Sequence, residues 1–311
     1  MSTKAAVQSA ITADLQNAGK MFADALKNII NFTFPVIISK RFQSGKVESG
    51  CATFIILNKE GWVLTAAHVV QDLLIQKQHE NEVADYNKKV AEINSDAALT
   101  HKQKQKQIGR LVSNPQWITN ISHWWGSNKF LIKNFIIDNL ADLALGKIES
   151  FDSAEIVSYP IFKNPSEKLF AGTSLCRLGF PFHNVTSTFD SIHNTFVLAP
   201  NTLPVPRFPI EGIFTREMVF IDETTKKEAK FIETSCPGLR GQSGGPIFDR
   251  HGNIWGLQSR TMHFPLGFSP KIKIGSKEIE EHQFINVGIG THVEEITRLL
   301  RDNNVNFSLS S

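Results

Sequence analysis

The run Gly-Gln-Ser-Gly-Gly-Pro at positions 241–246 constrains the folding of this 311-residue chain more than any other feature. Glycine has no Cβ, so glycines on both sides of a residue permit a turn that folds closely around one side chain. Here that side chain is Ser243, whose hydroxyl would lie beside backbone N–H groups of the same turn. Ser243 is therefore the candidate nucleophile, and the N–H groups of Gly241 and Ser243 are the candidate oxyanion-hole donors.

A serine hydroxyl is a weak nucleophile at neutral pH, so the site also needs a base and a group that orients the base. The apolar segment 62–65 leads through two alanines to His68, which predicts an imidazole at the end of a buried strand. A second apolar segment, 143–148, follows Asp142 and predicts a carboxylate at the mouth of another strand. His68 is the candidate base and Asp142 the candidate orienting acid.

The order His68, Asp142, Ser243 resembles that of the chymotrypsin-like serine proteases, the trypsin superfamily. Three blocks carry the resemblance, and a fourth resembles the segment that opens the second barrel in the HtrA-type branch: Leu64-Thr65-Ala66-Ala67-His68, Asp142-Leu143-Ala144-Leu145, Gly241-Gln242-Ser243-Gly244-Gly245-Pro246 and Leu178-Gly179-Phe180-Pro181. The resemblance extends over roughly residues 35–300, without a PDZ domain.

This resemblance implies an all-β core of two six-stranded antiparallel β-barrels. It also implies a serine endopeptidase in which Ser243 attacks a peptide carbonyl, His68 transfers the proton and Asp142 fixes the imidazole, with an acyl-enzyme intermediate. The alternative is an inactive protease-fold binding or scaffold module. No metal or other cofactor is expected, because the sequence has no Cys-x-x-Cys pair, no His-Glu-x-x-His and no phosphate-binding loop ending in Gly-Lys-Ser/Thr.

The resemblance, together with the apolar periodicity of the helical segments, implies that the chain has four parts. Residues 1–31 are expected to form an N-terminal amphipathic helix, and residues 32–157 the first barrel with a helical hairpin inserted at about 70–112. Residues 158–291 would form the second barrel, and residues 292–311 a C-terminal helix and tail.

Two of these helical segments are candidate surfaces for a regulatory protein partner. In the first, residues 4–31, the apolar face either docks on the protease body or forms an oligomer or partner contact, and its residues are Ile11, Leu15, Ala18, Phe22, Leu26 and Ile29. The second segment is the insertion. His68 and Asp142 are 74 positions apart, considerably more than the barrel strands between them require, and the insertion accounts for the excess. It is either a passive decoration or a docking surface for a regulator, a substrate or a second subunit.

The resemblance also implies where a substrate side chain would bind. The expected pocket residues are Pro237, Ser259, Arg260, Thr261 and Gly288. Pro237 stands where trypsin-type enzymes have an aspartate, so cleavage after Lys or Arg is not expected. Arg260, His263 or His292 would favour an acidic substrate residue, and a small apolar residue is the alternative.

Gln242 precedes the candidate nucleophile, at a position where zymogen-type relatives have an aspartate that pairs with a newly released N-terminus. Glutamine carries no charge and cannot form that ion pair. Activation by N-terminal cleavage is therefore not expected, and we expect regulation by a partner or by assembly.

Cysteine usage and net charge bear on the compartment and the partners. The chain has three cysteines, Cys51, Cys176 and Cys236, and Val69 stands where secreted relatives have a disulfide-forming cysteine. This pattern favours a reducing compartment, so the protein is expected to be cytoplasmic. The net charge of +3 is too small to indicate nucleic-acid binding, and no apolar run approaches the roughly 20 residues of a membrane span. The expected partners are a protein or peptide substrate and a regulatory protein.

Overall fold

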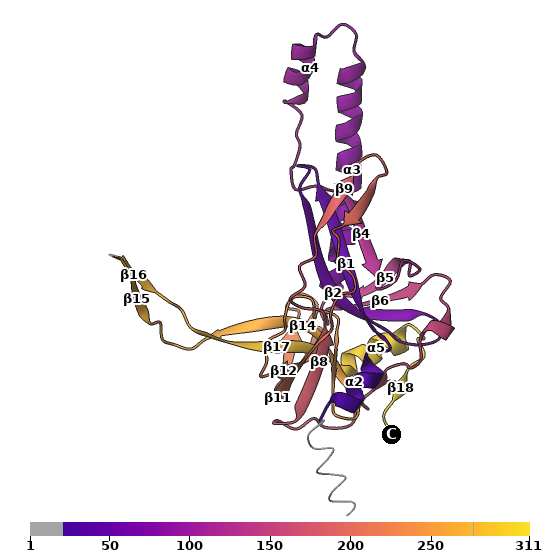
Figure 1. Cartoon of the computed structure of the whole chain (residues 1–311), viewed down its shortest axis with the longest axis vertical. Helices are drawn as coiled ribbons and strands as arrows, with labels where there is room; N and C mark the ends of the chain where they lie inside the picture. Colours follow the sequence, from indigo (N-terminus) through magenta and orange to yellow (C-terminus); the bar gives the residue numbers. More distant parts are fainter. Residues whose placement is uncertain (1–20, 276) are drawn as a thin grey trace, which may run out of the picture.

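Two mainly antiparallel β-sheets form the body of the protein in the computed structural model, which describes residues 21–275 and 277–311 (Figure 1). The first sheet has the order β4-β1-β2-β3-β6-β5, with β1 (Thr33–Phe42), β2 (Val47–Ile56), β3 (Trp62–Thr65), β4 (Ile118–Trp125), β5 (Ile132–Asp138) and β6 (Leu143–Ile148). It curls until Trp125 of one edge strand packs against Phe135 of the other, with ring centroids 5.5 Å apart. The edges of this half-barrel therefore meet through side chains.

The second sheet closes on itself through backbone hydrogen bonds. Strand β13 pairs with both β8 and β14, which completes the ring β13-β8-β11-β12-β17-β14. Its strands are β8 (Ser174–Gly179), β11 (Phe208–Ile221), β12 (Glu228–Thr234), β13 (Pro246–Phe248), β14 (Asn253–Pro265) and β17 (Phe284–His292), and the short β7 (Ile161–Phe162) and β18 (Ser308–Leu309) extend it in parallel. The predicted fold of two six-stranded β-units is confirmed.

A continuous apolar core joins the two units. Phe54 and Leu64 of the first sheet belong to the same buried cluster as Phe231 and Ile289 of the second. Each such side chain contributes about 1.5–3 kcal/mol when it is fully buried. The junction between the units is therefore rigid enough to position residues from both sheets.

A helical hairpin projects from the first sheet (Figure 1). It consists of α3 (Ala67–Ser95) and α4 (His101–Ile108), and Thr100 and Gln103 form a capping box at the start of α4. Helix α3 begins directly after β3, ahead of the predicted insertion at about 70–112, because Ala67, Val69 and Val70 in its first turn are buried against the body. The candidate base His68 thus lies on this helix and not on a strand.

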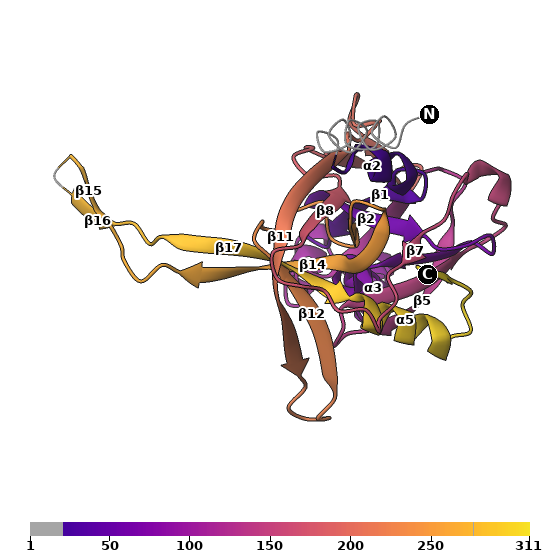
Figure 2. The same cartoon turned by 90° about the horizontal axis from the view of Figure 1, so that it is seen from below.

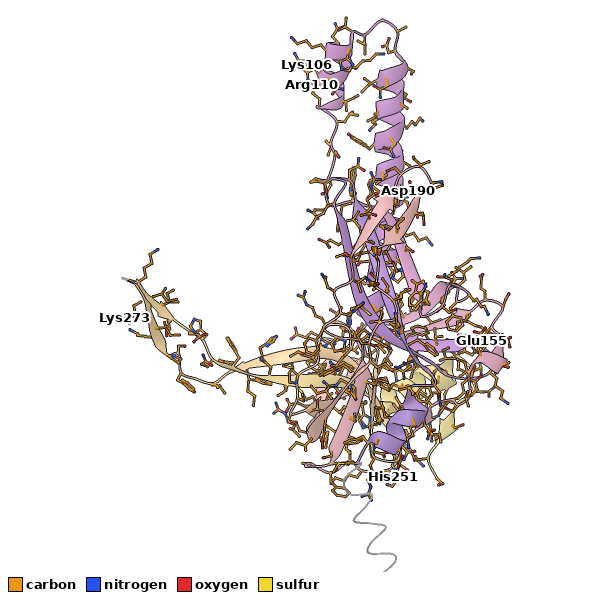
Figure 3. All side chains as sticks on the ribbon, viewed as in Figure 1. Lys106, Arg110, Glu155, Asp190, His251 and Lys273 are labelled. Carbon is orange, nitrogen blue, oxygen red and sulfur yellow. The ribbon has the colours of Figure 1, made fainter. Side chains whose placement is uncertain are left out.

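A second projection, which the sequence did not predict, extends from the other sheet. Strands β14 and β17 leave the body together, and the two-stranded ribbon of β15 (Lys271–Ile274) and β16 (Lys277–Glu280) lies beyond them (Figure 2). Labelled charged side chains lie on both projections: Lys106 and Arg110 on the helical hairpin, and Lys273 on the ribbon (Figure 3).

The remaining elements lie against the body. Helix α2 (Ala23–Ile29) is the described part of the predicted N-terminal helix, most of which lies outside the described residues, and it buries Ala25 and Ile29. Helix α5 (Val293–Asp302) buries one apolar face, and the other short elements are β9 (Ser187–Asp190), β10 (Thr195–Leu198) and the 3₁₀ turn Ser153–Glu155. Among the helices of the described residues, none has the length and apolarity that a membrane span needs.

Candidate active site

His68 and Asp142 form a direct pair. Nδ1 of His68 lies 2.9 Å from Oδ2 and 3.1 Å from Oδ1 of Asp142, and the backbone N–H of His68 donates to the same carboxylate at 3.1 Å. An ionised carboxylate only accepts hydrogen bonds, so this geometry favours the tautomer with the proton on Nδ1. Nε2, the other ring nitrogen, is then left as a proton acceptor.

The environment of Asp142 keeps its carboxylate ionised. The side chain is buried, and Ser259 Oγ donates a short hydrogen bond to Oδ2. Burial acts to raise the pKa of Asp142, but the hydrogen bonds and charge of His68 and the hydroxyl of Ser259 outweigh it and lower the pKa below its usual value. Sequence analysis expected Ser259 only in the substrate pocket and missed this contact. No local pattern reveals it, because 117 positions separate the two residues.

The turn before Ser243 has the conformation that the glycines predict. The N–H of Gln242 donates to the carbonyl of Leu239 at 2.9 Å, and Gly241 has a φ of +96°. This is a type II turn, which requires a positive φ at its third residue. A Cβ at position 241 would also collide with the carbonyl of Phe180, so only glycine fits here.

The carbonyl of Gly241 is held inside the protein. It accepts hydrogen bonds from the N–H of Phe180 at 3.0 Å and from Oγ1 of Thr53 at 2.7 Å. In the described part of the chain, no hydrogen bond engages the N–H of Gly241 or the N–H of Ser243. Both predicted oxyanion-hole donors are therefore available.

Ser243 lies where the two sheets meet. Its carbonyl accepts a hydrogen bond from the N–H of Thr53 in β2 at 2.8 Å. The next residue, Gly244, donates to the carbonyl of Gln258 in β14, and a Cβ on Gly244 would collide with the carbonyl of Thr53 and lie 3.0 Å from the N of Ala66. Ala66 is two residues before His68, so the nucleophile and the base belong to one junction.

Nucleophile and base, unlike base and acid, are not joined by a hydrogen bond among the described residues. The His68 side chain is 47% exposed, and Ser243 is half-buried. Over the described residues, no hydrogen bond joins the Ser243 hydroxyl to the imidazole. Such bonds are often long in a resting site and tighten when substrate binds.

The side chain of Gln242 closes the turn from within. It is fully buried, and its Oε1 accepts a hydrogen bond from the N–H of Leu239 at 3.0 Å. The backbone N–H of Gln242 in turn donates to the carbonyl of Leu239. The turn is therefore held by a reciprocal pair of hydrogen bonds.

The expected pocket residues lie in three segments that contact one another. The carbonyl of Pro237 accepts from the Arg177 guanidinium at 2.8 Å, and a Cβ on Gly288 would collide with that guanidinium. Thr261 Oγ1 donates to the carbonyl of Gly238 at 2.6 Å. Arg260 is exposed and lies over the rings of Phe220 and Phe231, at 5.5 and 5.3 Å.

The two histidines that were candidates for the pocket are engaged elsewhere. His292 is the N-cap of α5, where its Nδ1 accepts from the N–H of Glu294 at 3.1 Å, and burial lowers its pKa. His263 pairs with Asn286 at an exposed position on the β14–β17 projection.

Two of the three cysteines, Cys51 and Cys176, do not compete with Ser243 as nucleophiles. All three are free thiols, and burial raises the pKa of Cys51 and of Cys176 to about 12. The thiolate is the reactive form, so neither is activated at neutral pH. Cys236 lies in the loop before the turn, where its carbonyl contacts Arg177.

Two β-units with a histidine–aspartate pair and a glycine-rich serine turn at their junction define a trypsin-like peptidase fold. A family model for the trypsin-like peptidase domain matches residues 52–257, more than half of the chain. The chain belongs to this family of proteases, which are hydrolases that act on proteins. The match includes His68, Asp142 and Ser243. Curated proteins gave no match.

Proposed function

We propose that the protein is a serine endopeptidase. Ser243 Oγ attacks the carbonyl carbon of the scissile peptide while Nε2 of His68 takes its proton, and a C–O bond forms. The C–N bond then breaks, and His68 returns the proton to the leaving amine. Water, deprotonated by the same imidazole, hydrolyses the acyl-enzyme and regenerates Ser243.

One observation carries this proposal: Asp142 holds both the side chain and the backbone of His68, in a geometry that favours the proton on Nδ1 and leaves Nε2 to accept one. That is the arrangement a general base for a serine requires. The free N–H groups of Gly241 and Ser243 support it, because each such donor contributes about 10²–10³ in rate when an oxyanion develops.

Labelling with a fluorophosphonate probe tests the proposal directly. Wild-type protein is expected to form one covalent adduct, located at Ser243 by peptide mass, and Ser243→Ala is expected to form none. Ser166→Ala, which changes an exposed serine outside the site, serves as the matched control. An adduct that persists in Ser243→Ala would contradict the proposal. No adduct on wild type, alone and in lysate of the native host, would favour the inactive scaffold module.

We propose further that a partner or assembly regulates the enzyme through the helical hairpin. The support is that α3 carries His68 in its first turn and then leaves the body, so a protein that binds the outer hairpin acts on the element that holds the base. The described part of the N-terminal helix is a weaker candidate, because α2 packs on the body. The ring of Phe22 lies edge-on to that of Phe248, with the ring centroids 6.1 Å apart.

Replacing residues 81–112 with a short glycine-serine connection tests this regulation. The labelling rate of purified protein and its change on adding host lysate would be compared with wild type. We expect the response to lysate to disappear in the shortened chain. An unchanged response would contradict a regulatory role of the hairpin.

A further inference from the structure

Arg177 is a buried cation whose hydrogen bonds go to neutral groups. It lies in β8, its side chain is almost completely buried, and among the described residues no carboxylate forms an ion pair with it. Its guanidinium donates to three neutral oxygens: the carbonyl of Pro237 at 2.8 Å, Oγ1 of Thr234, and the carbonyl of Cys236 at 3.4 Å. Within the part of the chain that the structure describes, its Nε has no hydrogen-bond partner.

An arrangement of this kind is costly for the folded protein. A guanidinium retains its charge, and buried charges are normally paired with an opposite charge. Burial lowers the pKa of Arg177 to about 10, which still leaves it charged at neutral pH. A planar guanidinium matches a carboxylate in shape and charge, so the missing partner is best supplied by a carboxylate from another molecule.

The cation lies on the strand that supports the nucleophile turn. Arg177 and Gly179 are two residues apart in β8, so their side chains leave the same face. A Cβ on Gly179 would collide with Gln242, the residue before Ser243. Pro237, whose carbonyl accepts a hydrogen bond from the guanidinium, is only six residues before Ser243. The loop between them therefore connects the buried cation to the candidate nucleophile.

Two of the residues expected to line the substrate pocket, Pro237 and Gly288, lie at the guanidinium. Pro237 binds it through its carbonyl, and Gly288 leaves room for it by lacking a Cβ. Thr261 and Gly238, from the two facing segments, are joined directly by the hydrogen bond from Oγ1. This hydrogen bond ties together two of the segments between which the substrate side chain is expected to enter.

We propose that Arg177 recognises an acidic side chain, glutamate or aspartate, in the substrate residue just before the cleaved bond, and that the Thr261–Gly238 hydrogen bond opens to admit it. This inference rests on the proposed endopeptidase activity. Arg260 is the weaker candidate for this role, because its guanidinium is exposed and is already placed over two phenylalanine rings.

The test uses peptidyl diphenyl phosphonates, which react covalently with an activated serine. Four probes share two alanines and differ only in the residue that bears the phosphonate: glutamate, glutamine, alanine or lysine analogues. Wild type is expected to react with the glutamate probe about ten- to a hundredfold faster than with the glutamine probe, the ratio typical of a buried charge-assisted hydrogen bond. Arg177→Met should lose this ratio, Arg177→Lys should keep part of it, and the surface control Arg250→Met should keep it whole.

Thr261→Val removes the hydroxyl at nearly constant shape and tests the opening step. It is expected to raise the rate with the glutamate probe, and a lowered rate would contradict the role given to this hydrogen bond. If Arg177→Met does not fold, as judged by circular dichroism, Arg177→Lys and Arg260→Met decide the question: the glutamate-to-glutamine ratio should fall in the first and stay whole in the second, and the reverse would overturn the role of Arg177.

The outcomes separate this inference from the proposed function. Fluorophosphonate labelling of Ser243 with equal rates for the glutamate and glutamine probes would overturn the role of Arg177 and leave the endopeptidase intact. The same holds if Arg177→Met folds and keeps the ratio. Absence of all labelling would overturn the endopeptidase itself and with it the acidic pocket.

Discussion

The two β-units position their candidate catalytic residues by different means. Ser243 is held by backbone: the turn around it packs on Thr53 and Phe180, and Gly241 and Gly244 have no room for a Cβ. His68 is held by a side-chain pair with Asp142 and by the first turn of α3, most of which lies outside the body.

This difference indicates which half of the site is adjustable. The serine turn changes only if main-chain contacts between the two sheets break. The imidazole is half exposed and depends on one carboxylate and on one helix end. The base is therefore the more adjustable residue, and the proposed regulation through the hairpin would act on it rather than on the nucleophile.

The largest expected effect comes from removing the carboxylate that orients the base. In Asp142→Asn the amide can present an N–H to Nδ1 and favour the wrong tautomer, so the fluorophosphonate labelling rate should fall by about 10⁴. Asp190→Asn is the matched control, because Asp190 also lies against a histidine Nδ1, that of His193 at 2.6 Å, but at an exposed site. Similar losses in both variants would contradict the role of Asp142.

A smaller effect is expected when the backbone half is changed. Gly241→Ala should lower the labelling rate by about 10²–10³, because the new Cβ meets the Phe180 carbonyl and displaces an oxyanion-hole donor. Gly172→Ala is the control: Gly172 has a φ of +91°, close to the +96° of Gly241, and open space around it. Both variants should lose about 1–2 kcal/mol of stability from the left-handed conformation. If Gly172→Ala slows labelling as much, strain alone explains the loss.

Ser259→Ala sharpens the view that Asp142 needs support from the second unit. The hydroxyl of Ser259 helps to keep the pKa of Asp142 low in the folded protein. The ionised carboxylate therefore stabilises the fold at pH values above its pKa in the unfolded chain, about 3.9, and this stabilisation is lost as the pH falls through the lower pKa of the folded protein. The variant should therefore be less stable by about 1.5–3 kcal/mol at pH 7, with the difference closing in acid.

Urea unfolding at pH 7 and at about pH 3 measures this difference. Ser39→Ala removes a similarly buried hydroxyl that bonds Ser49 instead of a carboxylate, so its cost should not depend on pH. Equal pH dependence in the two serine variants would contradict the link to Asp142.

Local sequence patterns predicted the turn around Ser243, which is held by backbone, better than the side-chain contacts that hold Asp142 and His68. Gly241 and Ser243 lie within one short run, and the steric needs of that run are visible in its letters. The contacts of Ser259 with Asp142 and of Arg177 with Pro237 join residues far apart in the chain, so no spacing rule reveals them. His68 was expected at a strand end because the apolar pattern of β3 does not show where α3 begins. The ribbon of β15 and β16 was missed because it lies away from any core and has no buried alternation.

The smallest effect on activity, and the last way to separate the two halves, concerns His123 in β4, which packs beside α3. The ring nitrogens are buried, and burial lowers the pKa of His123 from 6.5 to about 4, although the backbone of Val69 and the charge of Asp72 act in the opposite direction. As the pH falls, the unfolded chain protonates His123 before the folded protein does, so the free energy of unfolding is full above pH 6.5 and decreases as the pH drops toward 4.

In His123→Phe, which keeps a ring to stack on Trp125, about 2 kcal/mol of the stability lost between pH 7 and pH 5 should no longer be lost. Thermal unfolding at the two pH values measures this, with exposed His251→Phe as the control (Figure 3). Labelling at pH 7 should stay unchanged, and an equal pH response in both variants would show that the acid sensitivity lies outside the α3 side of the site.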